Sequence, residues 1–447
     1  MIGLTIYDLI LYPIYFIAIF HIFKKIRSKY ANNKQLYLYF TWGFRVKMFI
    51  IIVYTLLSHF IIRGDAVDLY FGEGKHFTEL IKNDLSKINL LFISAGKETD
   101  ALASDDEKGY LAIENNYMVV KVCIILCMVG FSCFAVVNLI IGFIAFLGSW
   151  QLYLFFLRQY PKPHKMMAFA CMGIPTVLFW SAGISKDTIC ITCLALITKC
   201  MYDITTGNKN SIRNWFLVIA SILLIYDIKP YIILSYLPFY LLFLINNKIS
   251  STKIPIIRYA LKLSIPILFI GLVSYISIYS KDLFKQYSSD KLLDSISNSQ
   301  SAFTALNKDG VYGSFFSLGE FDGSLTGAVS MVPKAIMATL FRPFIWETKN
   351  FIMLLSALES ALLLFFTIQI FFKPKGIRVF FFTPFKNNLV FYCLAFTILF
   401  ATFVGLTTLN FGSLIRYKIP CMPFFVCGLV IINYIRAEKV KSSVMST

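Results

Sequence analysis

Charged residues are scarce in this sequence: they make up only 15% of 447 residues, whereas soluble domains carry about 25%. Hydrophobic residues make up 58% and aromatic residues 17%. Several apolar runs are about 18 to 25 residues long, which is enough to cross a bilayer. The scarcity of charge excludes an ordinary soluble domain. Because a membrane span must satisfy its own backbone hydrogen bonds, the runs are predicted to be helices.

Residues that bind metals or form disulfides are few or unsuitably spaced. The four histidines make no H-x-x-H or H-E-x-x-H motif. None of the ten cysteines lies in the long acidic segments, which argues against a disulfide framework. Cys190 and Cys193 form one C-x-x-C without a second pair, so packing inside a helix is the favoured interpretation. The sequence shows no dedicated metal cage and no certain cofactor, and a divalent metal is optional.

Acidic residues are almost absent from alternate short connections. The chain has 42 Lys and Arg against 24 Asp and Glu, a net charge of +18. Asp and Glu gather chiefly in 63–118 and 280–347. This is the positive-inside pattern, so the charge indicates membrane orientation and not a nucleic-acid partner. The basic segments, expected on the inner side, are 24–34, 158–165, 209–213, 248–258, 373–378 and 436–441.

These patterns predict an all-α fold, a polytopic transmembrane helical bundle of about eleven crossings in one integral-membrane domain over residues 1–447. The first run lacks the features of a signal peptide and is expected to be retained. Two long outer loops, 63–118 and 280–349, interrupt the bundle. The predicted helices are 4–23, 46–62, 139–157, 166–184, 188–204, 214–227, 231–246, 259–279, 350–372, 388–409 and 420–436.

Two further helices are expected in or beside the first outer loop. In 76–93, apolar residues recur at three- and four-residue spacing, which predicts an amphipathic juxtamembrane helix. Segment 118–137 is long enough to cross, but a crossing there would break the alternation of basic loops. It is therefore interpreted as a re-entrant or interfacial helix.

Five polar islands recur at the predicted outer ends of helices: RGDAVDLYFGEG (63–74), GISKDTI (183–189), DIKPY (227–231), LFRPFIWE (340–347) and LIRYKIP (414–420). Cations kept on the face that should be poor in Lys and Arg need a reason, although single cations at helix ends often only contact lipid headgroups. A lipid-linked phosphate is such a reason. The candidate phosphate-binding residues are Arg63, Lys186, Lys229, Arg342, Arg416 and Lys418.

A carboxylate beside bound phosphate suits sugar transfer, which needs a base for the acceptor hydroxyl. Asp65 is the first candidate, since it directly follows the helix 46–62 and Gly64 permits a sharp turn. Asp68, about one helical turn later, is the second candidate. The alternative for Asp65 is an ordinary residue of a helix C-terminal turn.

The chain resembles the GT-C superfamily of integral-membrane glycosyltransferases, in particular the family 39-like enzymes that depend on polyprenyl-phosphate sugars. The resemblance rests on GDAVDLYFGEG (64–74), GIPTVLFWSAGISKDTICITCLALI (173–197) and RYKIPCMPF (416–424). It implies that Asp65 is the catalytic base and Asp187 a further site carboxylate. It also implies that Arg416 and Lys418 contact the carrier phosphate.

The leading hypothesis is a bacterial inner-membrane glycosyltransferase. It would move a sugar from a polyprenyl-phosphate donor to a glycan, lipid or protein acceptor on the outer face, in contact with membrane lipids. One alternative is a polysaccharide-repeat polymerase or O-antigen ligase that depends on outer-face arginines. Others are a transporter or flippase of lipid-linked glycans, for which midplane polar residues are few and no inverted repeat is evident, and a structural subunit of an envelope complex.

Overall fold

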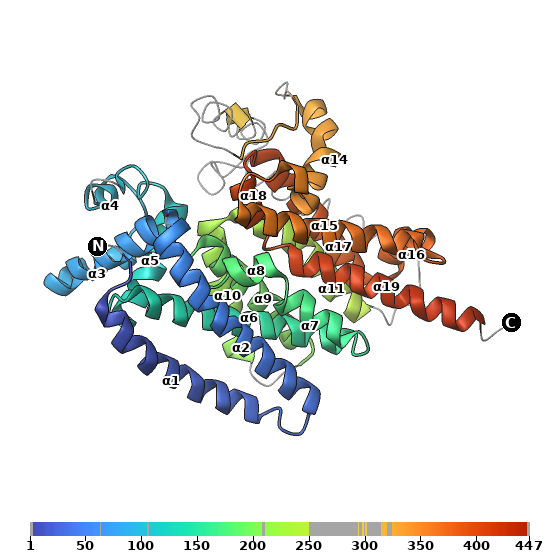
Figure 1. The fold of residues 1–447 in the computed structure, drawn as a ribbon, viewed down its shortest axis with the longest axis horizontal. Helices are drawn as coiled ribbons and strands as arrows, with labels where there is room; N and C mark the ends of the chain where they lie inside the picture. The colour runs from blue at the N-terminus through green and yellow to red at the C-terminus, as the bar shows by residue number, and fades with distance from the viewer. Residues whose placement is uncertain are drawn as a thin grey trace. The chain divides into compact units, whose positions relative to one another are not determined.

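The structure is a computed structural model that describes residues 3–62, 64–104, 107–207, 211–249, 314–319 and 324–444, with residues 294, 297, 298, 300 and 301. Over these residues the chain is helical and contains no strand, only an isolated antiparallel bridge between Phe315 and Asn410. The chain runs through the helices drawn in Figure 1, and its internal contacts group them into two compact units. The first unit comprises Met1–Gln159 and Cys171–Pro230, and the second comprises Tyr160–Ala170 and Tyr231–Thr447.

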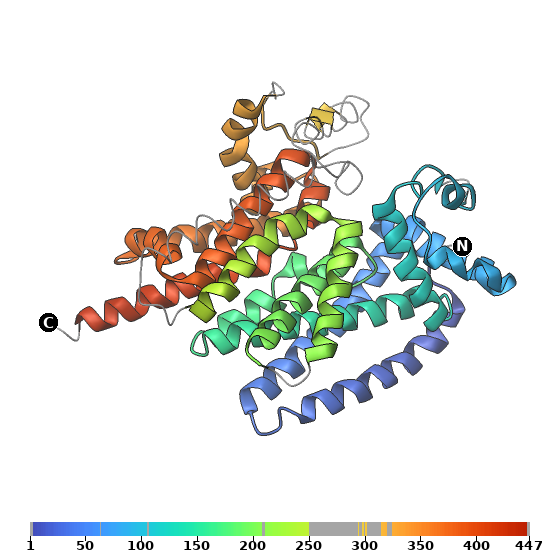
Figure 2. The same cartoon turned by 180° about the vertical axis from the view of Figure 1, so that it is seen from behind.

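The core of the first unit is α6 packed against α9 and α2. Gly142 of α6 permits the close approach of α2, because a Cβ there would lie 2.6 Å from the Cδ1 atom of Ile51. α1 lies along the edge of the unit in both views, and only 17% of its most apolar stretch is buried, as expected for a helix that faces lipid (Figures 1 and 2). The helices of this unit are α1 (Ile6–Ser28), α2 (Lys34–Leu57), α3 (Glu73–Asn83), α4 (Lys97–Ala101), α5 (Glu114–Val129), α6 (Phe134–Gln159), α8 (Pro175–Trp180), α9 (Lys186–Thr205) and α10 (Ser211–Ile228).

The core of the second unit is built on α17, which packs against α14 and α19. Gly405 of α17 meets the backbone of α14 so closely that an added Cβ would lie 2.3 Å from the oxygen of Ala335. Buried aromatic rings, among them Tyr236 and Tyr392, fill the space between α11 and α17. The helices are α11 (Pro230–Ile249), α14 (Leu325–Phe341), α15 (Phe351–Phe372), α16 (Gly376–Lys386), α17 (Asn388–Thr407), α18 (Phe411–Tyr417) and α19 (Met422–Val444); most of α7 (His164–Met172) also belongs here.

The predicted polytopic helical membrane architecture is confirmed. Eight described helices are long and apolar enough to span a membrane, or up to nine if the bent pair α18 and α19 forms one span. These nine correspond to nine of the predicted crossings. The predicted helix 259–279 lies outside the described residues, as does most of the loop 280–349 before residue 314.

The predicted crossing 166–184 is divided into two short helices, α7 and α8. Pro175 begins α8, and the residue before it, Ile174, is extended with φ −66° and ψ 118°. A proline disfavours helical geometry in the preceding residue and donates no backbone hydrogen bond, so the helix is interrupted there.

Two predicted boundaries were wrong. α2 begins at Lys34 and not at 46, because the Asn33 side chain accepts a hydrogen bond from the backbone N–H of Leu36 and caps the helix. Segment 118–137 is not one helix: α5 ends at Val129, Phe131 and Ser132 adopt positive φ, and α6 begins at Phe134.

The first outer loop folds onto the body of its unit. The predicted amphipathic helix in 76–93 is α3 followed by a 3₁₀ helix, Leu85–Leu91. The apolar face of α3 is buried against α5, where the rings of Phe77 and Tyr117 lie 6.0 Å apart. All ten cysteines of the chain are buried and none forms a disulfide bond, which agrees with a role in packing.

Candidate functional site

The start of α9 holds the first group of predicted site residues. The Ser185 hydroxyl accepts a hydrogen bond from the backbone N–H of Thr188 and caps the helix. Asp187 lies in the first turn, where the helix dipole favours a negative charge. Lys186 is half-buried, and its ammonium group donates a hydrogen bond of 2.7 Å to the side-chain oxygen of Asn115 at the start of α5.

Lys229 reaches this helix start from the tight turn between α10 and α11. Its backbone N–H donates to the oxygen of Ile225, and Pro230 begins α11 immediately afterwards. The Lys229 ammonium lies 2.6 Å from a carboxylate oxygen of Asp187, and the two side chains are only 6% and 5% exposed. Since a buried charge is tolerated only with a partner, this ion pair fixes the α10–α11 turn to α9.

The end of α2 is also held near the start of α9. The buried Asn138 of α6 donates to the hydroxyl of Thr55 in α2 and accepts from the backbone N–H of Ile184, just before α9. Asp65 follows α2 on an exposed stretch of chain, and its charge lies close enough to act on Lys186. The sequence-predicted Asp65, Lys186, Asp187 and Lys229 therefore belong to one group, named here the α9 cluster.

The backbone around Asp65 departs from a regular α-helix. π-helical turns cover Ser58–Ile62 and Val67–Gly72, and Gly64 has a φ of 75°. π-helical turns are frequent at functional sites. Asp68, the second candidate base, instead accepts a hydrogen bond of 3.2 Å from the backbone N–H of Gly64 and so stabilises the turn. Arg63 lies outside the described residues.

The α9 cluster contains two cations and two carboxylates, which balance one another. Lys186 interacts with the charges of Lys229, Asp65 and Asp187. Asp227, in the same polar island as Lys229, interacts electrostatically with Glu114 and Lys121 of α5. Three of the five predicted polar islands thus converge at one end of the first unit.

The other two islands converge in the second unit around Arg342. Its guanidinium group forms a bidentate ion pair with Glu347 and lies 4.5 and 5.0 Å from the ring centres of Phe316 and Phe411. Its backbone oxygen accepts a hydrogen bond of 3.3 Å from the ammonium group of Lys418. Arg342 therefore joins the end of α14, the 3₁₀ turn Ile345–Glu347 and α18.

Lys418 and Arg416 differ in accessibility. Lys418 is fully buried, and its ammonium group also donates a hydrogen bond of 3.0 Å to the hydroxyl of Ser360 on α15. Arg416 is half-buried on α18. Arg416 is the more accessible of the two.

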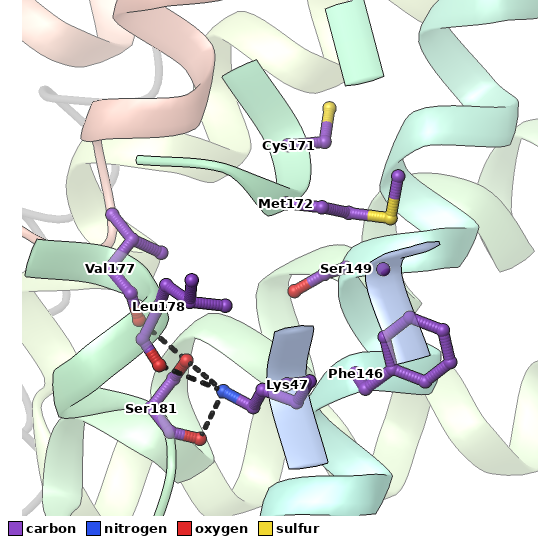
Figure 3. A pocket seen from close by; sticks show the side chains of 9 residues that line it. Lys47, Phe146, Ser149, Cys171, Met172, Val177, Leu178 and Ser181 are labelled. Carbon is purple, nitrogen blue, oxygen red and sulfur yellow. Dashed lines mark hydrogen bonds between the residues drawn. The ribbon is translucent and has the colours of Figure 1, made fainter. Parts of the chain in front are cut away.

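Sequence reasoning missed Lys47, which is 3% exposed near the middle of α2. Its ammonium group donates to the backbone oxygens of Leu178 and Ser181 and to the Ser181 hydroxyl, at the C-terminal end of α8 (Figure 3). The small cavity beside it, lined also by Phe146 and Met172, has a volume of about 10 Å³. A lysine inside an apolar run is the signal for such a residue. The predicted helix start at 46 concealed it by placing Lys47 at a helix end.

Among the residues that the structure describes, no group of three or more His, Cys, Asp or Glu side chains is arranged to hold a metal ion. Comparison of the chain with protein-family models, curated proteins and solved structures returned no match.

Proposed function

We propose that this multi-pass membrane protein is a glycosyltransferase of GT-C type. It takes a sugar from a polyprenyl-phosphate donor and attaches it to a glycan, lipid or protein on the outer face of a bacterial inner membrane. The observation that carries the proposal is the exposed Asp65 within electrostatic reach of Lys186. An acceptor hydroxyl needs a base, and a departing phosphate needs a nearby cation.

In the proposed step, the Asp65 carboxylate takes the proton of the acceptor hydroxyl. The hydroxyl oxygen bonds to the anomeric carbon of the sugar while the bond from that carbon to the phosphate oxygen breaks. The electron pair leaves with the phosphate, whose negative charge is compensated by Lys186. Asn115 orients Lys186, and the Asp187–Lys229 pair holds the helix end on which Lys186 lies.

The resemblance also implies phosphate contacts by cations of the second unit, which is considered by itself. We assign Arg416 to the carrier phosphate, since it is half-buried at the end of α18. The ammonium group of Lys418 is hydrogen-bonded to Ser360, so we assign it to holding α15 and α18 together. In the first unit, that of Lys229 is likewise bonded to Asp187 and holds the start of α9. Arg342 positions the chain around it through its ion pair with Glu347.

The test measures sugar transfer by the full-length protein in nanodiscs that contain radiolabelled undecaprenyl-phosphate sugars (glucose, mannose, galactose and aminoarabinose in turn) and an extract of envelope acceptors. Asp65→Asn is expected to lower the transfer rate by about 10²- to 10⁴-fold, the usual contribution of a general base. Asp84→Asn is the matched control, since Asp84 is an exposed carboxylate of the same loop that only caps Leu85–Leu91.

Three outcomes would contradict the assignment. Full activity of Asp65→Asn would show that Asp65 is not the base. Loss of activity only on changing Arg416 or Arg342, with Asp65 dispensable, would favour a polymerase or ligase. Movement of the labelled carrier across vesicles without modification would favour a transporter.

A further inference from the structure

An open pocket lies in the second unit. Its volume is about 780 Å³, within the range of roughly 300–1,000 Å³ that is usual for small-molecule sites. The walls come from the segment 317–319, from α14 and from the 3₁₀ turn after it. The residues that matter below are Ser317, Lys334, Arg342, Phe344, Trp346 and Glu347.

The segment 317–319 holds Lys334 at the pocket. The Lys334 ammonium group donates a hydrogen bond of 3.3 Å to the backbone oxygen of Leu318. Gly319 has a φ of 116°, a conformation that favours glycine, and its backbone N–H donates to the Ser317 hydroxyl oxygen. Within the described ranges, Lys334 has no carboxylate partner, so its positive charge is uncompensated there.

Arg342 and Glu347 form a fixed, neutral pair on the same wall. The carboxylate of Glu347 accepts from the Nε and Nη2 atoms of Arg342 and from the backbone N–H of Phe344. Among the described residues, the side-chain hydrogen bonds of Arg342 involve its Nε and Nη2 atoms and not its Nη1 atom. The pair therefore holds a guanidinium group at the pocket without adding net charge.

Trp346 gives the pocket a flat apolar surface. The residue is 82% exposed, and its ring stacks on that of Phe344 with ring centres 4.9 Å apart and planes 21° apart. An exposed indole held by a second ring suits a ligand with a flat apolar face, and the indole N–H is another donor. Four groups of the lining residues can donate hydrogen bonds to a ligand: Lys334 Nζ, Arg342 Nη1, the Ser317 hydroxyl and the Trp346 N–H.

We infer that this pocket binds a phosphorylated saccharide, with the sugar ring on Trp346 and the phosphate between Lys334 and Arg342. Sugar rings have the apolar face that an indole matches, and phosphate oxygens accept hydrogen bonds from Arg and Lys. The inference goes beyond the proposed function and does not depend on it. Binding itself requires no transfer.

The test is equilibrium binding to the full-length protein in nanodiscs by isothermal titration, with glucose 1-phosphate, glucose and inorganic phosphate as separate probes. Glucose 1-phosphate is expected to bind with a dissociation constant on the order of 1 mM, and at least about tenfold more tightly than glucose or phosphate. Trp346→Ala should weaken glucose 1-phosphate about tenfold. Lys334→Gln should abolish the preference for glucose 1-phosphate over glucose.

The matched controls are Trp215→Ala on α10 and Lys386→Gln at the end of α16, which should leave binding unchanged. A parallel titration into nanodiscs that contain undecaprenyl-phosphate glucose distinguishes the sources. If this lipid competes with glucose 1-phosphate, the natural ligand is lipid-linked, and if it does not, the ligand is soluble; both results support the pocket.

Equal affinity for inorganic phosphate and glucose 1-phosphate, or normal binding by Trp346→Ala, would overturn the inference. So would absence of binding at ten times the expected dissociation constant for every probe. The Asp65→Asn variant separates this inference from the proposed function. If this variant binds glucose 1-phosphate normally while the unaltered protein shows no sugar transfer, the inferred pocket is supported and the enzymatic proposal is refuted.

Discussion

Asp187 and Lys229 show how single residues hold the candidate site together. Both are almost completely buried, and each charge is compensated by the other across 2.6 Å. Desolvation makes a buried pair a weak source of net stability, but removal of one partner is costly because the other remains buried and charged. The neighbouring Lys186 makes the two partners unequal, since it is attracted by Asp187 and repelled by Lys229.

Asp187→Asn is therefore expected to destabilise the protein more than Lys229→Met. The first change leaves two ammonium groups without their buried carboxylate, whereas the second leaves Asp187 with Lys186 as an alternative partner. We expect a loss of about 3–5 kcal/mol for Asp187→Asn, seen as a lower thermal midpoint in detergent. Lys162→Met, which breaks the exposed pair of Lys162 and Glu438, is the control and should cost at most about 1 kcal/mol. A smaller effect of Asp187→Asn than of Lys229→Met would contradict this account.

For single residues, the sequence predicted which positions belong to the candidate site but not which side chains pair with one another. The polar islands were visible because Lys, Arg and Asp stand out against apolar helices. That Lys229 pairs with Asp187, 42 positions away, depends on the packing of α9 against α10, and spacing along the chain carries no information about it. Asn115 was missed for the same reason, because its role comes only from its contact with Lys186.

The helix α8 likewise depends on contacts with a residue that is distant in the sequence. It has only six residues, so the backbone oxygens of its last turn need partners from elsewhere. Lys47 of α2 supplies hydrogen bonds to two of these oxygens. The helix pair α2 and α8 is thus linked by one side chain in a region of low polarity, where a lost hydrogen bond is not replaced by water.

Lys47→Met is expected to loosen this link. The apolar side chain preserves volume but leaves the oxygens of Leu178 and Ser181 without their donor, at a cost of roughly 1–3 kcal/mol. Lys47→Arg keeps a donor and should restore most of the loss. The measurement is the thermal midpoint of the purified protein, with Val46→Met, on an exposed neighbouring position, as the unaffected control. An unchanged midpoint for Lys47→Met would show that the link contributes little.

Most helices could be predicted from hydrophobicity, whereas interruptions and ends could not. Long apolar runs identified the eight described spans, and also the bent pair α18 and α19, because burial in lipid imposes length and composition. The division of α7 from α8 follows from Pro175, and the separation of α5 from α6 from a turn at Phe131 and Ser132. Both breaks occur inside apolar stretches, where a hydropathy pattern stays uniform across the turn.

For the whole molecule, the positive-inside pattern predicts the side of each connection. Single cysteines can test it by labelling with a membrane-impermeant maleimide in intact cells. Ser94→Cys and Lys349→Cys, in the two long loops, should be labelled from outside. Asn32→Cys and Lys386→Cys, both exposed positions of predicted inner segments, should react only after the membrane is opened. Labelling of Ser94→Cys and Lys349→Cys from opposite sides would contradict the predicted topology.

The buried state of the native thiols has a practical consequence for such mapping. Since all ten are enclosed by protein, a bulky water-borne reagent should find no target in the unaltered chain. Labelling can then be attributed to the introduced cysteine, without the many replacements that a cysteine-free version would need. The packing that conceals these sulfur atoms thus leaves the rest of the surface open to chemical mapping.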